Sequence, residues 1–188
     1  ARRALALAGA PVALAALGGC GFQLRRPAQL RIRRLHLAGF APLSAMADEL
    51  RRQLRATPEL RLVDAAPLAE VVLSALVDQR EQVVAASTAT GLVRELTLRT
   101  RLRFTVTTPQ GLELVPETEL LLSRDMSFTE TAALAKEQEA QLLFRAMTGD
   151  IAGQVLRRLA ALEPATWAVQ GTGADVRRSV TASEWAAS

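Results

Sequence analysis

Two neighbouring stretches of alternation constrain the fold more than any other feature of the sequence. In residues 92–107 most even positions are apolar, while Glu95, Arg99, Arg101 and Arg103 stand at odd positions, the period of a strand with one buried face. Its apolar members are Leu92, Leu96, Leu98, Leu102, Phe104 and Val106. Residues 112–128 repeat the pattern after the turn signal Pro109-Gln110-Gly111. Residues 71–86 predict a third hairpin-linked strand, with apolar positions at Val71, Leu73, Ala75 and Val77.

Helical periodicity precedes and follows these strands. Residues 43–56 predict a helix whose apolar face is formed by Leu43, Ala47, Leu50 and Leu54. Residues 132–162 predict a second helix, with Thr129 as its N-cap candidate. Its apolar stripe is Leu143, Met147, Ile151, Val155, Leu159 and Leu162.

A first strand over residues 30–37 completes the main elements, and residues 60–63 are a candidate short strand. The order is therefore strand, helix, three hairpin-linked strands, helix. Because each strand has one apolar face, both helices can cover the same side of a single sheet. We predict a two-layer α+β domain over residues 30–163, with two helices packed on one face of a four-stranded, mostly antiparallel sheet.

The first twenty residues have the pattern of a bacterial lipoprotein signal peptide. Two arginines precede an apolar run over residues 5–17, which is shorter than the roughly 20 residues of a membrane-spanning helix. The run ends in Leu17-Gly18-Gly19-Cys20, where small residues precede a cysteine that can be acylated. We predict a signal peptide over residues 1–19 and lipidation of Cys20. The alternative is an N-terminal helix with an incidental buried cysteine.

The segments next to the domain have simple expected roles. Gly21 stands where aspartate would signal retention in the inner membrane, so the outer membrane is favoured. Residues 20–29 are predicted to be a lipidated tether, whose acyl chains hold the protein to outer-membrane lipid. Residues 164–188 have no periodicity and many small residues, and we predict a disordered C-terminal tail.

The composition argues against an enzyme. The chain of 188 residues has one cysteine, one histidine and no tyrosine, which removes most metal clusters and most Ser-His or Cys-His catalysis. No nucleophile elbow or phosphate loop occurs, so we predict no catalytic residue, no metal and no cofactor. We expect a structural or solvated role for His36.

Arginine supplies all but one of the 23 basic residues, Lys136 being the exception. This preference for arginine over lysine either reflects genome base composition or suits phosphate binding, because guanidinium groups pair well with oxyanions. The sequence pI near 10.7 would also suit nucleic acid. The export signal argues against that partner.

Three motifs give the chain a resemblance to a known family. The start Cys20-Gly21-Phe22-Gln23-Leu24-Arg25, the polar run over residues 134–139 and the helix end over residues 154–159 occur in the order and spacing of the LPS-assembly lipoprotein LptE family. The resemblance covers residues 20–162 and implies two helices on a four-stranded sheet, without enzymatic activity. It implies an outer-membrane lipoprotein, on the periplasmic side and in the lumen of the β-barrel LptD. There it plugs the barrel, assists barrel assembly and binds lipopolysaccharide (LPS) in transit.

A less specific alternative is an outer-membrane lipoprotein that binds peptidoglycan or another envelope protein. For LPS phosphates the basic candidates are Arg80, Arg94, Arg99, Arg101, Arg103 and Lys136. The alternative is that these basic residues have no ligand and form a solvated face whose charge is balanced by glutamates. Of the six we favour Arg94 and Lys136, which have few acidic partners across the sheet, and then Arg80.

The polar face of the two alternating strands predicts a ladder of Arg–Glu pairs. Same-face partners must share parity, so the loop between the strands holds an odd number of residues. A three-residue loop pairs Arg101 with Glu117 and Arg99 with Glu119. A five-residue loop over residues 108–112 pairs Arg103 with Glu117 and Arg101 with Glu119. Either ladder leaves a polar, non-aggregating face that suits the polar lumen of a barrel.

Overall fold

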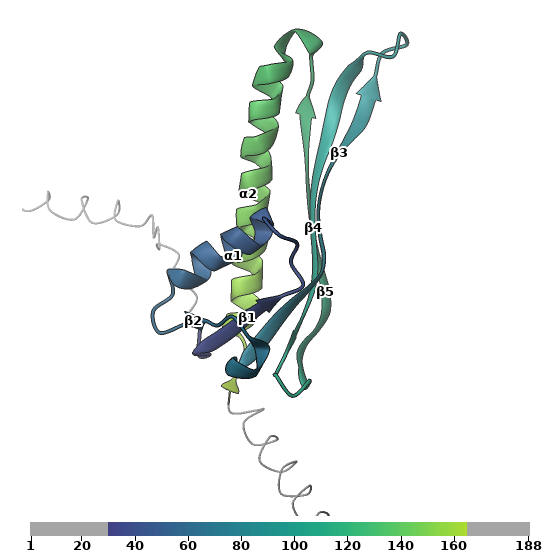
Figure 1. Cartoon of the computed structure of the whole chain (residues 1–188). Coiled ribbons are helices and arrows are strands. Elements are labelled where there is room, and N and C mark those ends of the chain that lie inside the picture. The colour runs from purple at the N-terminus through teal and green to yellow at the C-terminus, as the bar shows by residue number, and fades with distance from the viewer. Residues whose placement is uncertain (1–29, 165–188) are drawn as a thin grey trace, which may run out of the picture.

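The computed structural model of the chain describes residues 30–164 (Figure 1). The predicted signal peptide, Cys20, the predicted tether and nearly all of the predicted tail lie outside these residues. The elements are, in chain order, β1 (Arg34–Ala38), α1 (Ala45–Arg55), β2 (Arg61–Leu62), the 3-10 helix η1 (Ala66–Leu68), β3 (Val71–Ser87), β4 (Val93–Thr107), β5 (Glu113–Ser127), the 3-10 helix η2 (Glu130–Ala132) and α2 (Ala133–Ala160).

The sheet has five strands in the order β2-β1-β3-β4-β5. β3, β4 and β5 form the expected antiparallel meander, whereas β1 runs parallel to both of its neighbours, β2 and β3. The predicted count of four, mostly antiparallel strands is therefore corrected to five in a mixed sheet. The fifth is the candidate short strand, of which only Arg61 and Leu62 pair with β1, and two residues are too few to show a period.

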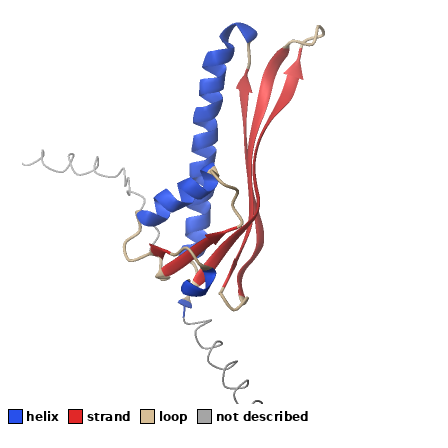
Figure 2. Ribbon diagram, viewed as in Figure 1, coloured by secondary structure: helices blue, strands red, loops and turns tan. Residues whose placement is uncertain are grey.

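Both helices pack on the same face of the sheet, and none of the elements described in residues 30–164 covers the opposite face (Figure 2). The apolar positions of β4 face the helices, and Leu98, Leu102, Phe104 and Val106 are fully buried. The predicted stripe of α2 meets them, with Met147 beside Leu96 and Leu98, and Ile151 and Val155 beside Leu102 and Phe104. Leu92 is the exception, since it lies in the turn before β4 and is exposed.

Helix α1 begins at Ala45 because Ser44 caps it. The Ser44 hydroxyl accepts a hydrogen bond from the Ala47 backbone N–H at 2.9 Å, which satisfies one free donor of the first turn. Leu43, expected on the apolar face, has φ 60° and is 97% exposed. It therefore lies outside the helix, and the buried face is instead formed by Met46, Ala47, Leu50 and Leu54.

Helix α2 begins at Ala133, with no side-chain cap. Thr129, the predicted cap, precedes the short helix η2, and its side chain makes no capping hydrogen bond. The predicted end at residue 162 extends slightly beyond the last helical residue, Ala160.

A bulge in β3 changes which side chains face the helices. Ala75 pairs with Phe104, but the next pair is Val77 with Arg103, so one residue of β3 has no partner. Beyond the bulge the even-numbered residues share the face of Leu102. Val77, predicted on the apolar face, therefore lies on the polar face opposite Arg103, and Asp78 and Arg80 turn towards the helices.

Candidate functional site

The structure brings Arg94 and Lys136 to the same end of the molecule. Arg94 lies at the start of β4, and its carbonyl oxygen accepts a 2.8 Å hydrogen bond from the Phe128 N–H just after β5. Lys136 lies in the first turn of α2, and its Nζ donates to the Ser127 Oγ at 3.0 Å. Ser127 and Phe128 are consecutive, so the Lys136 ammonium contacts the residue next to the backbone partner of Arg94.

The two cations differ in their surroundings. Lys136 is mostly buried, and its Nζ lies 2.9 Å from the Glu139 carboxylate one turn later on α2. The expectation that it has few acidic partners holds across the sheet but overlooked this partner on its own helix. Arg94 is exposed, and within residues 30–164 it forms no ion pair. Of the two cations, Arg94 is therefore the one whose charge is not paired within residues 30–164.

Arg80 does not join them. It pairs with Thr100 in the sheet, six residues along β4 from Arg94, a separation of roughly 20 Å in a strand. Its guanidinium lies over the ring of Phe144, 5.5 Å from the centroid, on the face covered by α2. This cation–π contact gives Arg80 a partner within the fold. The three predicted LPS-binding residues therefore do not form one site.

Arg80 lines a small cavity of about 160 Å³ between the start of α1, the sheet and α2. Ser44 donates a hydrogen bond to Asp78 here, and Thr148 lies on the α2 side. Thr100 is fully buried, and its hydroxyl has no hydrogen-bond partner. The sequence does carry a signal for this residue, a threonine at an even position of β4 where alternation requires an apolar side chain.

The outward face of the sheet is mostly polar, with the exposed Leu121 and Val83 among its polar groups, and it carries the expected ion pairs. Arg103 Nε lies 3.2 Å from a Glu117 carboxylate oxygen, and Arg101 Nε lies 3.8 Å from Glu119. Thr97 donates to Asp125 at 2.6 Å on the same face. These are the pairs expected for the five-residue loop, and the hairpin indeed starts with Thr107 opposite Glu113.

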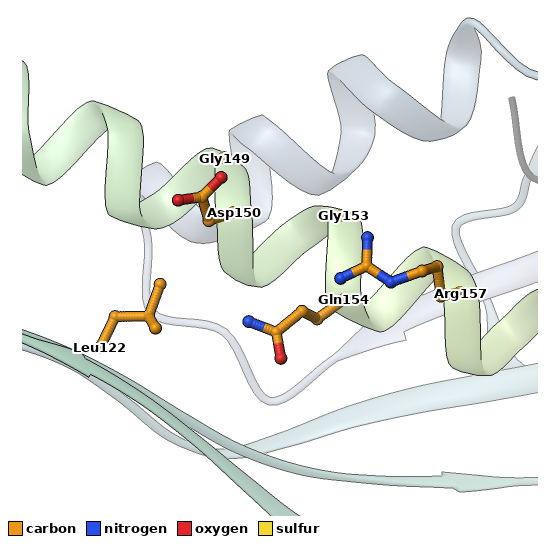
Figure 3. A pocket seen from close by; sticks show the side chains of 6 residues that line it. All are labelled: Leu122, Gly149, Asp150, Gly153, Gln154 and Arg157. Atoms are coloured by element: carbon orange, nitrogen blue, oxygen red, sulfur yellow. The ribbon is translucent and has the colours of Figure 1, made fainter. Parts of the chain in front are cut away.

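A second cavity, of about 190 Å³, lies between α2 and Leu122 of β5 (Figure 3). Gly149 and Gly153, one turn apart on α2, leave room there, and Asp150, Gln154 and Arg157 supply polar groups at its wall. Gly149 has a further role on its other side. Its carbonyl accepts from the Gln53 side chain at 3.3 Å, and a Cβ on it would lie 3.8 Å from Glu49 of α1.

His36, the single histidine, has a structural partner. Its Nδ1 lies 2.9 Å from the carbonyl oxygen of Val63, next to β2. Within residues 30–164 no group of three or more His, Cys, Asp or Glu side chains could hold a metal ion. In that same part of the chain, no helix has both the length and the apolar character needed to cross a membrane.

Solved structures with this fold are bacterial lipoproteins. An uncharacterized lipoprotein B from Nitrosomonas europaea is 27% identical with a TM-score of 0.64, covering 75% of this chain and 91% of its own. The rare lipoprotein B from Shewanella oneidensis is 28% identical with a TM-score of 0.57, covering 68% and 94%. A minor lipoprotein from Acinetobacter baumannii, at 22% identity and a TM-score of 0.57 (70% and 93% covered), shares the fold. No curated protein matches the chain.

The fold places the chain in the class of two-layer α+β domains that these lipoproteins share. The family LptE, described as lipopolysaccharide-assembly, matches residues 32–159, which is most of the chain. The chain therefore belongs to the LptE family and is an LPS-assembly lipoprotein. This is a non-enzymatic family.

Proposed function

We propose that this protein plugs the lumen of the outer-membrane β-barrel LptD, assists the assembly of that barrel, and binds LPS in transit. In this proposal residues 1–19 are removed as a signal peptide, and acylated Cys20 anchors the chain to the periplasmic side of the outer membrane. Family membership supports the general role. The barrel contact, the LPS site and the lipid anchor are proposed here in addition to that general role.

The bare sheet face is the observation that carries the plug role. A second layer covers one face of the sheet only, and the other face presents paired charges at Arg103–Glu117 and Arg101–Glu119 (Figure 2). An uncovered apolar face would be an aggregation hazard, whereas this one is already polar. The lumen of a transmembrane barrel is polar too, so such a face can lie against it without burying unpaired apolar surface.

Arg94 and Lys136 are the proposed contacts for LPS phosphates. They lie together at the end of the sheet, and Arg94 has no ion-pair partner within residues 30–164. Arg80 is a weaker candidate because its guanidinium already lies over Phe144. A phosphate bound at Arg94 and Lys136 would compete with Glu139 for the lysine.

Co-purification with the barrel tests the plug role. The chain is co-expressed with LptD, the barrel is captured by an affinity tag in detergent, and the retained chain is measured. We expect stoichiometric retention of the parent chain. Ser123→Trp, on the polar face opposite Arg99, should reduce it strongly, whereas Arg145→Trp on the exposed side of α2 should not. Failure of the parent chain to co-purify would refute the plug role. Equal losses from both variants would refute the contact face alone.

Membrane fractionation and acyl labelling test the anchor. We expect the parent chain to take up labelled fatty acid and to fractionate with the outer membrane. Cys20→Ser should remove both properties, because the thiol is the only group in the chain that can carry a thioether-linked diacylglycerol. An unlabelled parent chain would contradict the anchor, whatever the outcome of the co-purification.

A further inference from the structure

A cleft of about 500 Å³ lies between α1 and the edge of the sheet formed by β1 and β2. In Figure 1 β1 and β2 lie towards the opposite end of the molecule from the β3–β4 turn, and α1 crosses its middle. Basic side chains from three elements line the cleft, with His36 from β1, Arg51 and Arg55 from α1 and Arg61 from β2. The cleft is thus separate from Arg94 and Lys136.

The charges that line this cleft are unbalanced. Arg51 donates to Asp48 at 2.9 Å and is neutralised by it. Arg55 and Arg61 have no ion-pair partner in the part of the chain that the structure describes. Asp64 is the one acidic residue in the lining. Arg55 and Arg61, both exposed, therefore present two cationic groups to the cleft that no acidic side chain of the described fold pairs with.

His36 adds an oriented polar group. Its Nδ1 lies 2.9 Å from the Val63 carbonyl, and a carbonyl oxygen can only accept, so Nδ1 carries the proton. In the neutral ring Nε2 is then an acceptor, suited to a hydroxyl of a bound ligand. The hydrogen bond fixes the ring plane in advance of binding.

We propose that this cleft binds a phosphate group, held chiefly by Arg55 and Arg61 with His36 at its side. Guanidinium groups present parallel N–H donors that match phosphate oxygens, and Arg55 and Arg61 both line this cleft without ion-pair partners in residues 30–164. The cavity also exceeds what a bare phosphate fills, which leaves room for the glycerol or sugar attached to it. The site is additional to the LPS contacts of the proposed function.

Two sources present this chemistry, a free phosphate and the phosphate of a lipid headgroup. The headgroup is favoured if Cys20 is acylated. Only this choice between the two sources rests on the proposed function. The described chain begins at Leu30, four residues before β1. A segment of ten residues reaches at most about 35 Å, so the cleft would stay close to the lipid surface.

Nuclear magnetic resonance of the full chain carrying Cys20→Ser tests the site. The chain, in neutral detergent micelles, is titrated with inorganic phosphate, with chloride at equal ionic strength as the reference. We expect saturable shifts of the Arg55 and Arg61 Nε–H signals and of the His36 ring signals, caused by phosphate only. Arg55→Gln combined with Arg61→Gln should weaken the apparent affinity read from His36 by more than about tenfold. Arg124→Gln combined with Arg145→Gln removes the same charge elsewhere and should leave it unchanged.

A second arm distinguishes the two sources. The acylated parent chain and its Arg55→Gln, Arg61→Gln variant are placed in phosphatidylcholine nanodiscs with and without phosphatidylglycerol, and the His36 ring signals are followed. His36 shifts that need phosphatidylglycerol and vanish in the double variant would identify a lipid headgroup. Shifts with inorganic phosphate alone would identify a free phosphate. The proposal is overturned if neither probe shifts these signals, or if both double variants lose binding equally, since general surface charge would then be the cause.

Discussion

Arg103 and Glu117 form an ion pair at 3.2 Å although they are not partners in the β4–β5 ladder. The residue opposite Arg103 is Glu119, and Glu117 lies on the diagonal. Glu119 in turn reaches diagonally to Arg101. The expected pairs thus form through a different register, because two irregularities between Phe104 and Thr107 shift the strands after the hairpin has begun. Long side chains on a strand can bridge this diagonal distance.

The diagonal pair should contribute little to stability. Its side chains are 43% and 55% exposed, and exposed pairs typically contribute about 0.2–1 kcal/mol. A double-mutant cycle with Arg103→Gln and Glu117→Gln, read by urea unfolding, should give a coupling free energy below about 1 kcal/mol. The coupling should fall further in high salt. A coupling that is large and indifferent to salt would contradict the exposed, solvated state of the pair.

Burial of Leu102 should matter far more than the neighbouring charge. Leu102 is fully buried between the sheet and α2, and truncating a buried leucine to alanine typically costs about 2–5 kcal/mol. Leu102→Ala should therefore lower the free energy of unfolding by that amount, measured in urea. Arg101→Ala, on the outer face, should cost less than about 1 kcal/mol. Equal losses would mean that the two faces are assigned wrongly.

Gly39 should tolerate no side chain. It has φ 76°, and a Cβ at this position would collide with the backbone carbonyl oxygen of Ala75. Gly39→Ala should therefore lower the free energy of unfolding by about 1–2 kcal/mol for the left-handed backbone, and by a further amount for the collision. Gly111→Ala is the matched control, since Gly111 also has a positive φ but nothing lies within 4 Å of its Cβ position. A thermal midpoint no lower for Gly39→Ala than for the control would show that the β1–β3 contact can relax.

Loss of the Ser44 hydroxyl should weaken the start of α1. Ser44 accepts from Ala47 and donates to Asp78, so Ser44→Ala leaves both partners unsatisfied. We expect a loss of about 1–2 kcal/mol, typical of an N-cap, in chemical unfolding. Ser44→Thr retains a hydroxyl and should recover most of it. If threonine were as destabilising as alanine, packing rather than capping would explain the effect.

The proposed LPS contacts should depend on charge rather than on shape. Arg94→Asp combined with Lys136→Asp should leave the chain folded, since both residues lie outside the buried core, yet bind LPS poorly. Binding by the parent chain should weaken as salt rises, because screening acts on exposed charges. Circular dichroism verifies the fold of the variant, and co-sedimentation with LPS measures binding. Undiminished binding by the folded variant would remove these two residues from the site and leave the plug role standing.

The alternation in residues 92–128 was enough to predict the buried faces of β4 and of β5 from Thr118 onward, since a period of two fixes faces wherever no residue is inserted. That condition fails at the start of β5, where Val115 lies opposite Val106, and it fails again in β3. The bulge after Ala75 reverses the parity, so Val77 turns outward and Arg80 turns towards Phe144. A single sequence with no partner strand in view does not reveal where such an insertion falls.

The convergence of His36, Arg55 and Arg61 was also beyond sequence reasoning. It depends on the parallel pairing of β2 with β1, and β2 has only two residues. Likewise the contact of Lys136 with Ser127 depends on how the short helix η2 turns the chain back from β5. Patterns specify elements and faces, but these contacts are set by how short connections place the elements.

The mixed sheet has a consequence for how the molecule folds. In the meander each pairing starts close to a turn, as with Thr107 and Glu113. The entropy cost of closing such a short loop is small, so the first contacts form readily. Leu35, in contrast, must find Val71 after α1, β2 and η1 have intervened. Contacts between distant parts of a chain are slower to form. We therefore expect the meander to form first and the parallel strands β1 and β2 to dock on it later. On this expectation β1, although it precedes the meander in the chain, is among the last elements to become native.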